Sequence, residues 1–138
     1  MNGRPSPFGF LWAFVLWMPL AAVAAEFVVG VTQSDAGGSI LLPVTLSGAS
    51  APVGIQFDVL YEKEALVSDP VMRGPATISH EVRSHLRSKG RRRVLIYSAP
   101  VREIPDGVII EIPFTISPTA KGKEAVGLDD IIIASTDG

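Results

Sequence analysis

The sequence contains no cysteine, and this absence excludes disulfide bonds, thiol nucleophiles and cysteine-ligated metals. Aromatic residues make up only 7% of the chain, and both tryptophans, Trp12 and Trp17, lie near the N-terminus. Neither sign of charge dominates, since 12 basic residues stand against 14 acidic ones, so binding to nucleic acid is not indicated. No segment keeps a sustained 3.6-residue hydrophobic period, so we expect no long helix.

The longest apolar run stands at the N-terminus, where Arg4 precedes FGFLWAFVLWMPLAAVAA. A positive start, an apolar centre and an end of small residues are typical of a secretory signal peptide. Pro19 and the small residues argue against a membrane anchor, and the run is short for a span of ~20 residues. We therefore predict a signal peptide over residues 1–25 and a mature domain over residues 26–138. That domain is expected to be secreted or periplasmic, and outside the membrane after cleavage.

The mature chain reads as a series of short strands separated by Gly, Pro and Ser. Alternating apolar residues predict strands over residues 27–31, 40–46, 53–61, 66–71, 77–82, 93–98, 108–116, 125–128 and 131–134. The alternation over 108–116 is the clearest and reads as unbroken. Pro43 predicts that its strand lies at a sheet edge or carries a bulge. Many short strands of this kind favour an all-β fold, either a sandwich or a barrel.

The strand over residues 53–61 has two different faces. One side carries the apolar residues Ile55, Phe57, Val59 and Tyr61, and it predicts a core. The other side carries Gln56, Asp58 and Leu60. This second side is either an ordinary solvent face or a surface that binds a partner.

A basic segment, SHEVRSHLRSKGRRR, covers residues 79–93, and its Lys89-Gly90 step predicts the tip of a hairpin. The candidate basic patch consists of Arg83, Arg87, Arg91 and Arg92. Such a patch either docks an acidic partner or an anionic polysaccharide, or it is a solvated hairpin whose charges discourage edge pairing.

The next strand, RVLIYS over residues 93–98, is apolar on both sides. One register sends Leu95 and Tyr97 outward, and the other sends Val94 and Ile96 outward. We take Val94 and Ile96 as the candidate partner-binding residues, because either register leaves apolar side chains on an exposed face.

Signals for catalysis and for metal binding are weak. No nucleophile elbow or His-centred triad can be read, so we expect no catalytic residue. His80 and His85 are five residues apart and lack an evident third ligand, so we expect no metal site there. Asp129, Asp130 and Asp137 suit either turns or a calcium ion, and we favour turns.

Four segments in this order resemble the cohesin domain family: FDVLYEKEALV (57–67), RVLIYS (93–98), IPDGVIIEIPFTI (104–116) and IIIASTDG (131–138). The resemblance implies a jelly-roll β-sandwich of about eight to nine strands, which receives dockerin domains and does no catalysis. In that family a last strand follows the closing Asp-Gly turn and pairs with the first strand. The resemblance therefore implies that the sequence is truncated, or that 131–134 is its last strand.

The resemblance also implies a binding surface. In cohesins the outward face of one sheet receives the dockerin helices, and an amide and an acidic residue two positions apart contact the partner. Gln56 and Asp58 match these positions, and Leu60 continues the same face. No cofactor is implied for this chain, and calcium is expected to be carried by the dockerin-like partner.

Two other functions stay open at this point. A carbohydrate-binding module would stack sugars on a row of aromatic residues, and the mature chain has few of these. A structural domain of a surface protein would need no dedicated ligand. All three readings are extracellular and share the same predicted fold.

Overall fold

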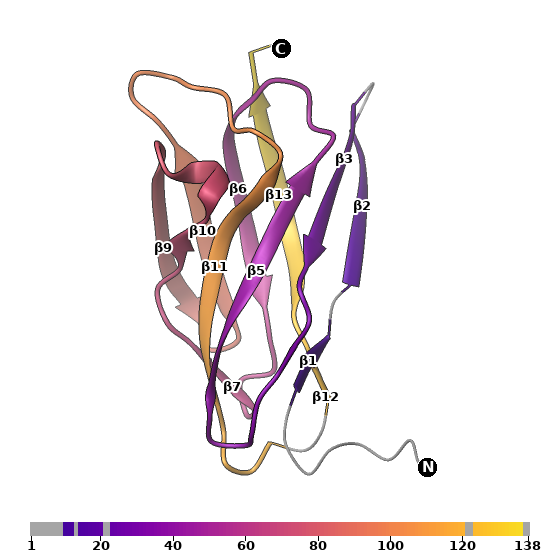
Figure 1. Cartoon of the computed structure of the whole chain (residues 1–138), viewed down its shortest axis with the longest axis vertical. Coiled ribbons are helices and arrows are strands. Elements are labelled where there is room, and N and C mark those ends of the chain that lie inside the picture. The colour runs from indigo at the N-terminus through magenta and orange to yellow at the C-terminus, as the bar shows by residue number, and fades with distance from the viewer. Residues whose placement is uncertain (1–9, 13, 21–22, 121–122, 137–138) are drawn as a thin grey trace.

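Two facing β-sheets form the body of the molecule (Figure 1). The computed structural model describes residues 10–12, 14–20, 23–120 and 123–136. One sheet has four strands in the order β13-β6-β10-β9. The other has the order β2-β3-β5-β11-β7, with β8 also paired to β11, and a small third sheet has the order β12-β1-β4. The prediction of an all-β sandwich is confirmed.

The strands have the following bounds. The four-stranded sheet consists of β13 (Gly127–Ser135), β6 (Pro52–Leu60), β10 (Arg91–Tyr97) and β9 (Glu81–Ser88). The larger sheet consists of β2 (Phe14–Leu20), β3 (Val23–Val29), β5 (Ser39–Ser47), β11 (Gly107–Ile116), β7 (Leu66–Ser68) and β8 (Met72–Arg73). The small sheet consists of β12 (Lys123–Ala125), β1 (Phe10–Trp12) and β4 (Thr32–Gln33).

One predicted strand begins later than expected. The segment predicted as a strand over 77–82 contributes the end of a short 3-10 helix, η1 (Pro75–Thr77), and β9 begins only at Glu81. Thr77 explains the change, because its buried hydroxyl group donates to the carbonyl of Ile109 at 2.7 Å and anchors η1 against β11.

The core lies between the two large sheets. Phe27, Phe57 and Phe114 are fully buried, and the rings of Phe27 and Phe57 meet edge to face with centroids 6.1 Å apart. This pair joins β3 of one sheet to β6 of the other. Burial of a large apolar side chain contributes roughly 2–3 kcal/mol, so such contacts can hold the sandwich together without disulfides.

Of the two alternatives predicted for Pro43, the edge strand is wrong, because β5 lies between β3 and β11. The bulge is also not at Pro43, which pairs with Glu111 beyond the register shift between Val108 and Ile110. Proline is tolerated there because the pairing of β3 with β5 ends at Val29 opposite Val44. The next residue, Gly30, donates its N–H to the carbonyl of Pro43 at 2.8 Å. A Cβ atom at Gly30 would lie 2.7 Å from Cγ of Pro43, so glycine is needed for this close approach.

The alternation predicted over residues 108–116 is interrupted near its start. The pairing of β11 with β5 shifts register between Val108 and Ile110, which marks a bulge. Ile109 and Ile110 are both fully buried as a result. From Ile110 onward the even-numbered residues face the core as predicted.

The first strand of the mature domain is covered on both sides. β3 lies between β5 and β2, and β2 belongs to the predicted signal peptide. Cleavage after Ala25 stays a prediction, and it would cut within β3 and remove β2. The edge of β3 would then become available for another strand.

Candidate functional site

The outer face of the four-stranded sheet carries the candidate residues of β6. Phe57 and Val59 point into the core, so Gln56, Asp58 and Leu60 point the other way. Strand pairing fixes their neighbours on this face. Gln56 lies between Ile132 of β13 and Leu95 of β10, whereas Asp58 lies between Asp129 and Arg93.

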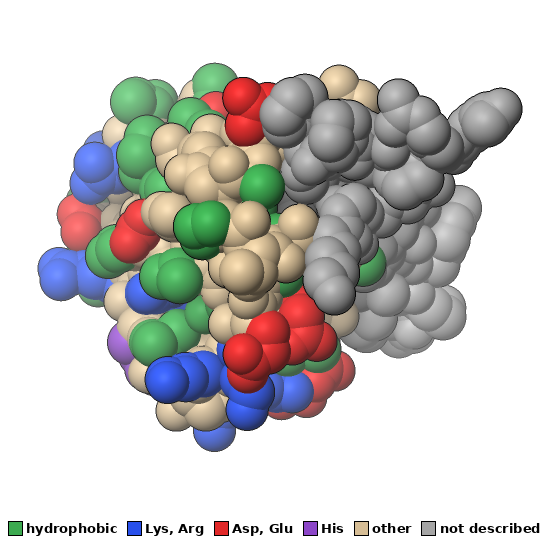
Figure 2. Space-filling view, turned by 90° about the horizontal axis from the view of Figure 1, so that it is seen from below, with side chains coloured by type: hydrophobic (Ala, Val, Ile, Leu, Met, Phe, Trp, Pro, Cys, Tyr) green, Lys and Arg blue, Asp and Glu red, His purple; other side chains and the backbone are tan. Residues whose placement is uncertain are grey.

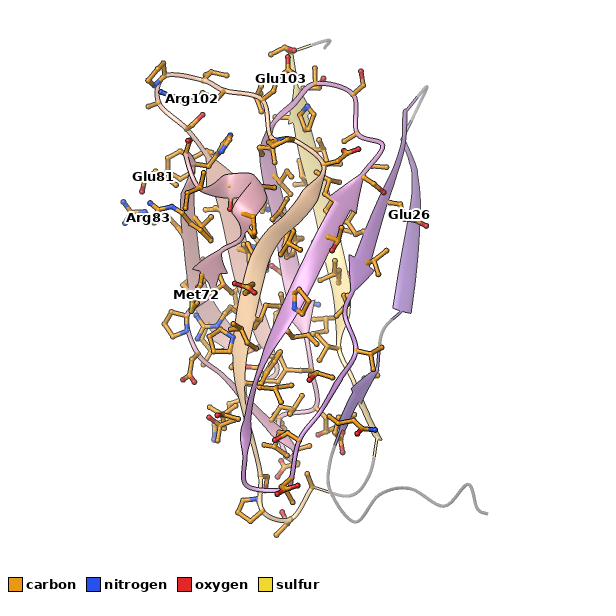
Figure 3. The ribbon with its side chains drawn as sticks, viewed as in Figure 1. Glu26, Met72, Glu81, Arg83, Arg102 and Glu103 are labelled. Atoms are coloured by element: carbon orange, nitrogen blue, oxygen red, sulfur yellow. The ribbon has the colours of Figure 1, made fainter. Side chains whose placement is uncertain are left out.

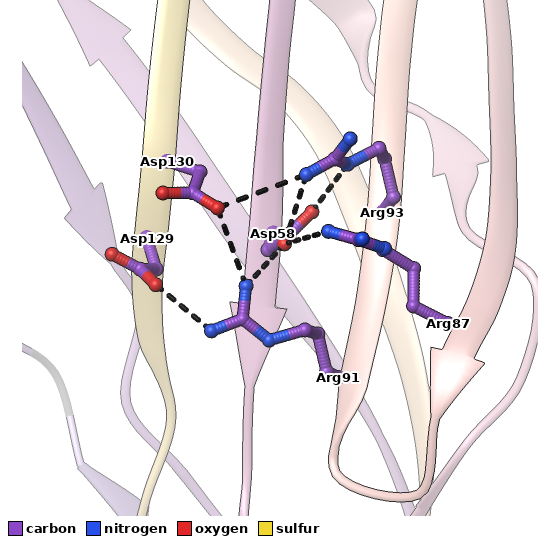
Figure 4. A network of polar contacts seen from close by, with 6 residues as sticks. All are labelled: Asp58, Arg87, Arg91, Arg93, Asp129 and Asp130. Carbon is purple, nitrogen blue, oxygen red and sulfur yellow. Dashed lines mark hydrogen bonds and ion pairs between the residues drawn. The ribbon is translucent and has the colours of Figure 1, made fainter.

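Asp58 is the centre of a charged network (Figure 4). Nε of Arg93 donates to Oδ1 of Asp58 at 2.7 Å, and Nη2 of Arg93 donates to Oδ2 at 3.2 Å. Nη1 of Arg87 donates to Oδ2 at 3.2 Å, and Nη1 of Arg91 donates to the same oxygen. These side chains cover the carboxylate completely, so Asp58 has no exposed surface.

Two further carboxylates complete the network from β13. Nη2 of Arg91 donates to Oδ2 of Asp129 at 2.9 Å, and Nη2 of Arg93 lies 3.7 Å from Oδ2 of Asp130. Asp130 has a positive φ of 51° at the bulge in β13, and this conformation leaves its side chain on the outer face beside the arginines. We call Asp58, Arg87, Arg91, Arg93, Asp129 and Asp130 the arginine–aspartate cluster.

The cluster keeps Asp58 ionised. Burial alone would raise the pKa of Asp58, but hydrogen bonds from Arg93 and Arg91 and their positive charges outweigh burial and lower this pKa to about 2. Hydrogen bonds to Asp129 and Asp58 raise the pKa of Arg91, and the hydrogen bond to Asp58 raises the pKa of Arg93. Asp58, Arg91 and Arg93 are therefore charged at neutral pH. Figure 2 shows basic and acidic side chains side by side at this end of the molecule.

The other end of the outer face is apolar and hollowed. A shallow depression of about 220 Å³ is lined on this face by Gly54, Gln56, Leu95, Tyr97, Ile132 and Ala134. Three of these side chains are well exposed: Ile132 at 58%, Tyr97 at 41% and Leu95 at 37%. We call this depression the apolar hollow. Exposed apolar side chains gathered on a rigid sheet are typical of a binding surface.

The predicted contacts through Val94 and Ile96 are wrong. Both residues are buried in the core, at 0% and 1% exposure. Val94 pairs with Phe57 across β10 and β6, and residues directly opposite each other in an antiparallel pair share one face. Leu95 and Tyr97 therefore face outward, in the alternative register.

The prediction that Asp58 offers a free acceptor to a partner is also corrected. The residue does point to the outer face, but three guanidinium groups occupy its oxygens. Gln56 and Leu60 are both partly exposed, as expected for that face. Of the three β6 candidates, Gln56 borders the apolar hollow.

Only part of the predicted basic patch lies on the surface. The hairpin of β9 and β10 forms as predicted, with Gly90 at a φ of 87°. Arg83 and Arg87 are exposed on β9 and Arg91 is partly exposed, but Arg92 points inward and is buried. Nε of Arg92 donates to Oγ of Ser68 at 2.8 Å, which links the two sheets.

Arg93 was missed as a site residue, although the hairpin contained its signal. A tip at residues 89–90 places alternate residues of the following strand on one face. Arg91 and Arg93 then share the face opposite to Arg92, as the structure shows.

The structure also shows the surroundings of the described residues that were considered as metal ligands. Nε2 of the buried His80 lies 3.1 Å from the carbonyl of Arg102, and His85 lies on the outer face opposite Arg93. Within the described ranges no group of three metal-binding side chains is present, and Asp129 and Asp130 contact arginines instead. Asp137 lies outside the described residues. Among the described residues no helix is long and apolar enough to cross a membrane.

Aromatic residues do not form a sugar-stacking row in the described mature chain. Phe27, Phe57 and Phe114 are in the core, and Tyr61 packs edge to face on Phe114 with ring centroids 5.3 Å apart. Tyr97 is exposed at the apolar hollow. This arrangement does not favour the carbohydrate-binding alternative.

The fold defines a β-sandwich domain whose four-stranded sheet carries an exposed apolar hollow. The family model of the cohesin domain matches residues 25–138, and the chain therefore belongs to the cohesin domain family. The family expected from the resemblance is confirmed. A search of curated proteins gives no significant match.

Solved cohesin structures share the fold. The sixth cohesin of Acetivibrio cellulolyticus scaffoldin B, in complex with a mutant Cel5 dockerin, is 22% identical with a TM-score of 0.66, over 75% of this chain and 81% of that one. A Clostridium thermocellum cohesin–dockerin complex of OlpA is 18% identical with a TM-score of 0.68, over 82% and 87%. A non-cellulosomal cohesin of the archaeon Archaeoglobus fulgidus is 22% identical with a TM-score of 0.63, over 75% and 72%.

Proposed function

We propose that this chain is a non-catalytic binding module that captures a dockerin-like protein domain on the outer face of β13, β6, β10 and β9. The observation that carries the proposal is the apolar hollow on a face whose other end is charged. Membership of the cohesin family and the similarity to cohesins in complex with dockerins support the same partner class. The module acts outside the cell, in assemblies that degrade polysaccharides.

The geometry suits recognition of a protein surface. The hollow is too shallow to enclose a small molecule, but it can accept one or two apolar side chains from a helix. Gln56 borders the hollow with an amide that can both donate and accept. The partner would bury Leu95, Tyr97 and Ile132, which are the exposed apolar side chains of this face.

Calorimetric titration with dockerin domains encoded by the same genome tests the proposal. Leu95→Asp should weaken binding at least about tenfold, because a carboxylate would be buried in an apolar contact. Leu41→Asp is the matched control, since Leu41 of β5 is exposed to 43% on the other large sheet. Equal losses for both variants, or no binding by any calcium-loaded dockerin, would contradict the proposed function.

Removal of calcium in the same experiment should affect the partner but not the present chain. We expect a chelator to abolish binding by unfolding the partner's calcium loops. The melting temperature of the present chain, measured alone, should not change. A chelator-induced drop in this melting temperature would show that the chain itself holds a structural calcium ion.

A further inference from the structure

The charges of the outer face are arranged as a gradient across the four strands. Asp129 and Asp130 of β13 are exposed to 46% and 56%, so the β13 side presents carboxylates. Arg91 and Arg93 in the middle are less exposed, at 29% and 22%. The β9 side presents the guanidinium groups of Arg87, exposed to 42%, and Arg83, exposed to 67%, beside the carboxylate of Glu81, exposed to 48%.

The arginines of β9 are only loosely held. Arg87 contacts an oxygen of Asp58 that Arg91 also contacts, so one carboxylate serves several guanidinium groups. Arg83 lies 3.6 Å from Glu81, and both side chains are well exposed. Exposed ion pairs of this kind contribute roughly 0–1 kcal/mol. Figure 3 shows Glu81 and Arg83 projecting from β9 at the edge of the molecule. Both arginines therefore keep donors for a partner.

Strand pairing places Arg83 directly beside the apolar hollow. Arg83 of β9 is paired with Leu95 of β10, and neighbouring strands lie ~4.8 Å apart. One turn of an α-helix spans ~5.4 Å. If a partner helix crosses the strands, the helix residue that enters the hollow and the helix residue above Arg83 are therefore separated by one helical turn.

We propose that the partner helix carries an acidic residue one turn from the apolar residue that fills the hollow, and that this acid pairs with Arg83. The inference rests on the proposed function and specifies the chemistry of its partner. The apolar contact supplies affinity, while the acidic residue sets the orientation of the helix on the sheet. A helix laid the other way would bring its acid toward Asp129 and Asp130, and like charges would then repel.

A display library tests this chemistry directly. The probe is a calcium-loop helix-pair scaffold with randomised outward positions, selected in parallel on the wild-type chain and on Arg83→Glu. Clones from the wild-type selection should be enriched in Asp or Glu one helical turn from a large apolar residue. Clones selected on Arg83→Glu should lose this acidic preference and gain Lys or Arg.

Affinities of the wild-type clones provide the quantitative readout. For clones selected on the wild-type chain, the affinity for Arg83→Glu should be about tenfold lower than for the wild type. Their affinity for Arg102→Glu should be less than about twofold lower. Arg102 is an exposed residue in the loop before β11 and serves as the control. Both variants replace an arginine by a glutamate, so they have the same net charge. Melting temperatures should stay equal, because neither site is buried.

Two results would overturn the inference, and they differ in meaning. Clones that lose affinity on Leu95→Asp but not on Arg83→Glu would leave the proposed face in place and refute the acidic partner. Clones that bind Leu95→Asp as tightly as the wild type would refute the face itself, and the inference with it.

Discussion

The two ends of one sheet face differ in how their side chains are satisfied. At the charged end, Asp58 is completely buried under guanidinium groups, and each carboxylate of the cluster contacts an arginine. At the apolar end, Leu95 and Ile132 are exposed without a covering segment in the described part of the chain. The charged end therefore serves the fold, while the apolar end is available for binding.

The difference shows that pointing outward and being available are separate properties. Gln56 and Asp58 are two residues apart on β6 and face the same way. Only their neighbours across the sheet distinguish them, since Gln56 has apolar neighbours and Asp58 has an arginine and an aspartate beside it. A partner can reach the first side chain and meets guanidinium groups over the second.

The largest loss of folding stability is expected from a substitution of Asp58, the central residue of the charged end. Asp58→Asn removes the buried negative charge and leaves the surrounding arginines uncompensated, so the free energy of unfolding should fall by about 3 kcal/mol. Urea denaturation measures this change. Asp129→Asn is the control, because Asp129 is 46% exposed and the loss there should stay below about 1 kcal/mol. Similar losses for the two variants would refute the special role of Asp58.

A smaller effect is expected from acid. The pKa of Asp58 lies at about 2 in the folded chain, below its ordinary value of 3.8, so its stabilising charge is present above pH 4. This contribution, about 2 kcal/mol, should disappear as the pH falls from about 4 toward 2. Stability measured against pH should flatten over this window in Asp58→Asn relative to the wild type. An unchanged slope would mean that other carboxylates dominate the acid response.

The smallest effect on folding is expected at the apolar end. Ile132→Ser removes an exposed side chain, so the free energy of unfolding should change by less than about 0.5 kcal/mol. Binding of the dockerin-like partner should nevertheless weaken. A loss of stability as large as that of Asp58→Asn would show that the hollow belongs to the core and would remove the contrast between the two ends.

Much of this fold could be predicted from alternation alone. Alternation predicts a core position for Phe57, and the structure buries this residue completely. Alternation could not orient β10, because Val94 and Ile96 are as apolar as Leu95 and Tyr97. The pairing with β6 decides this orientation, and a pairing between distant strands is not encoded in either strand separately.

The fate of Asp58 was unpredictable for a similar reason. Its arginine partners are 29 to 35 residues away in sequence and reach it only through the β9–β10 hairpin. Pro43 misled the assignment of β5 because an internal strand can hold proline where its neighbour strand stops pairing, as β3 does at Val29.

An NMR titration of the isotope-labelled chain with a calcium-loaded dockerin tests the central claim most directly. The account predicts that backbone amide shifts change most around Gln56, Leu95 and Ile132, on β6, β10 and β13. Amides of β5 and β11, on the opposite sheet, should keep their positions. Changes centred on Leu41 and Glu111 of that opposite sheet would contradict it.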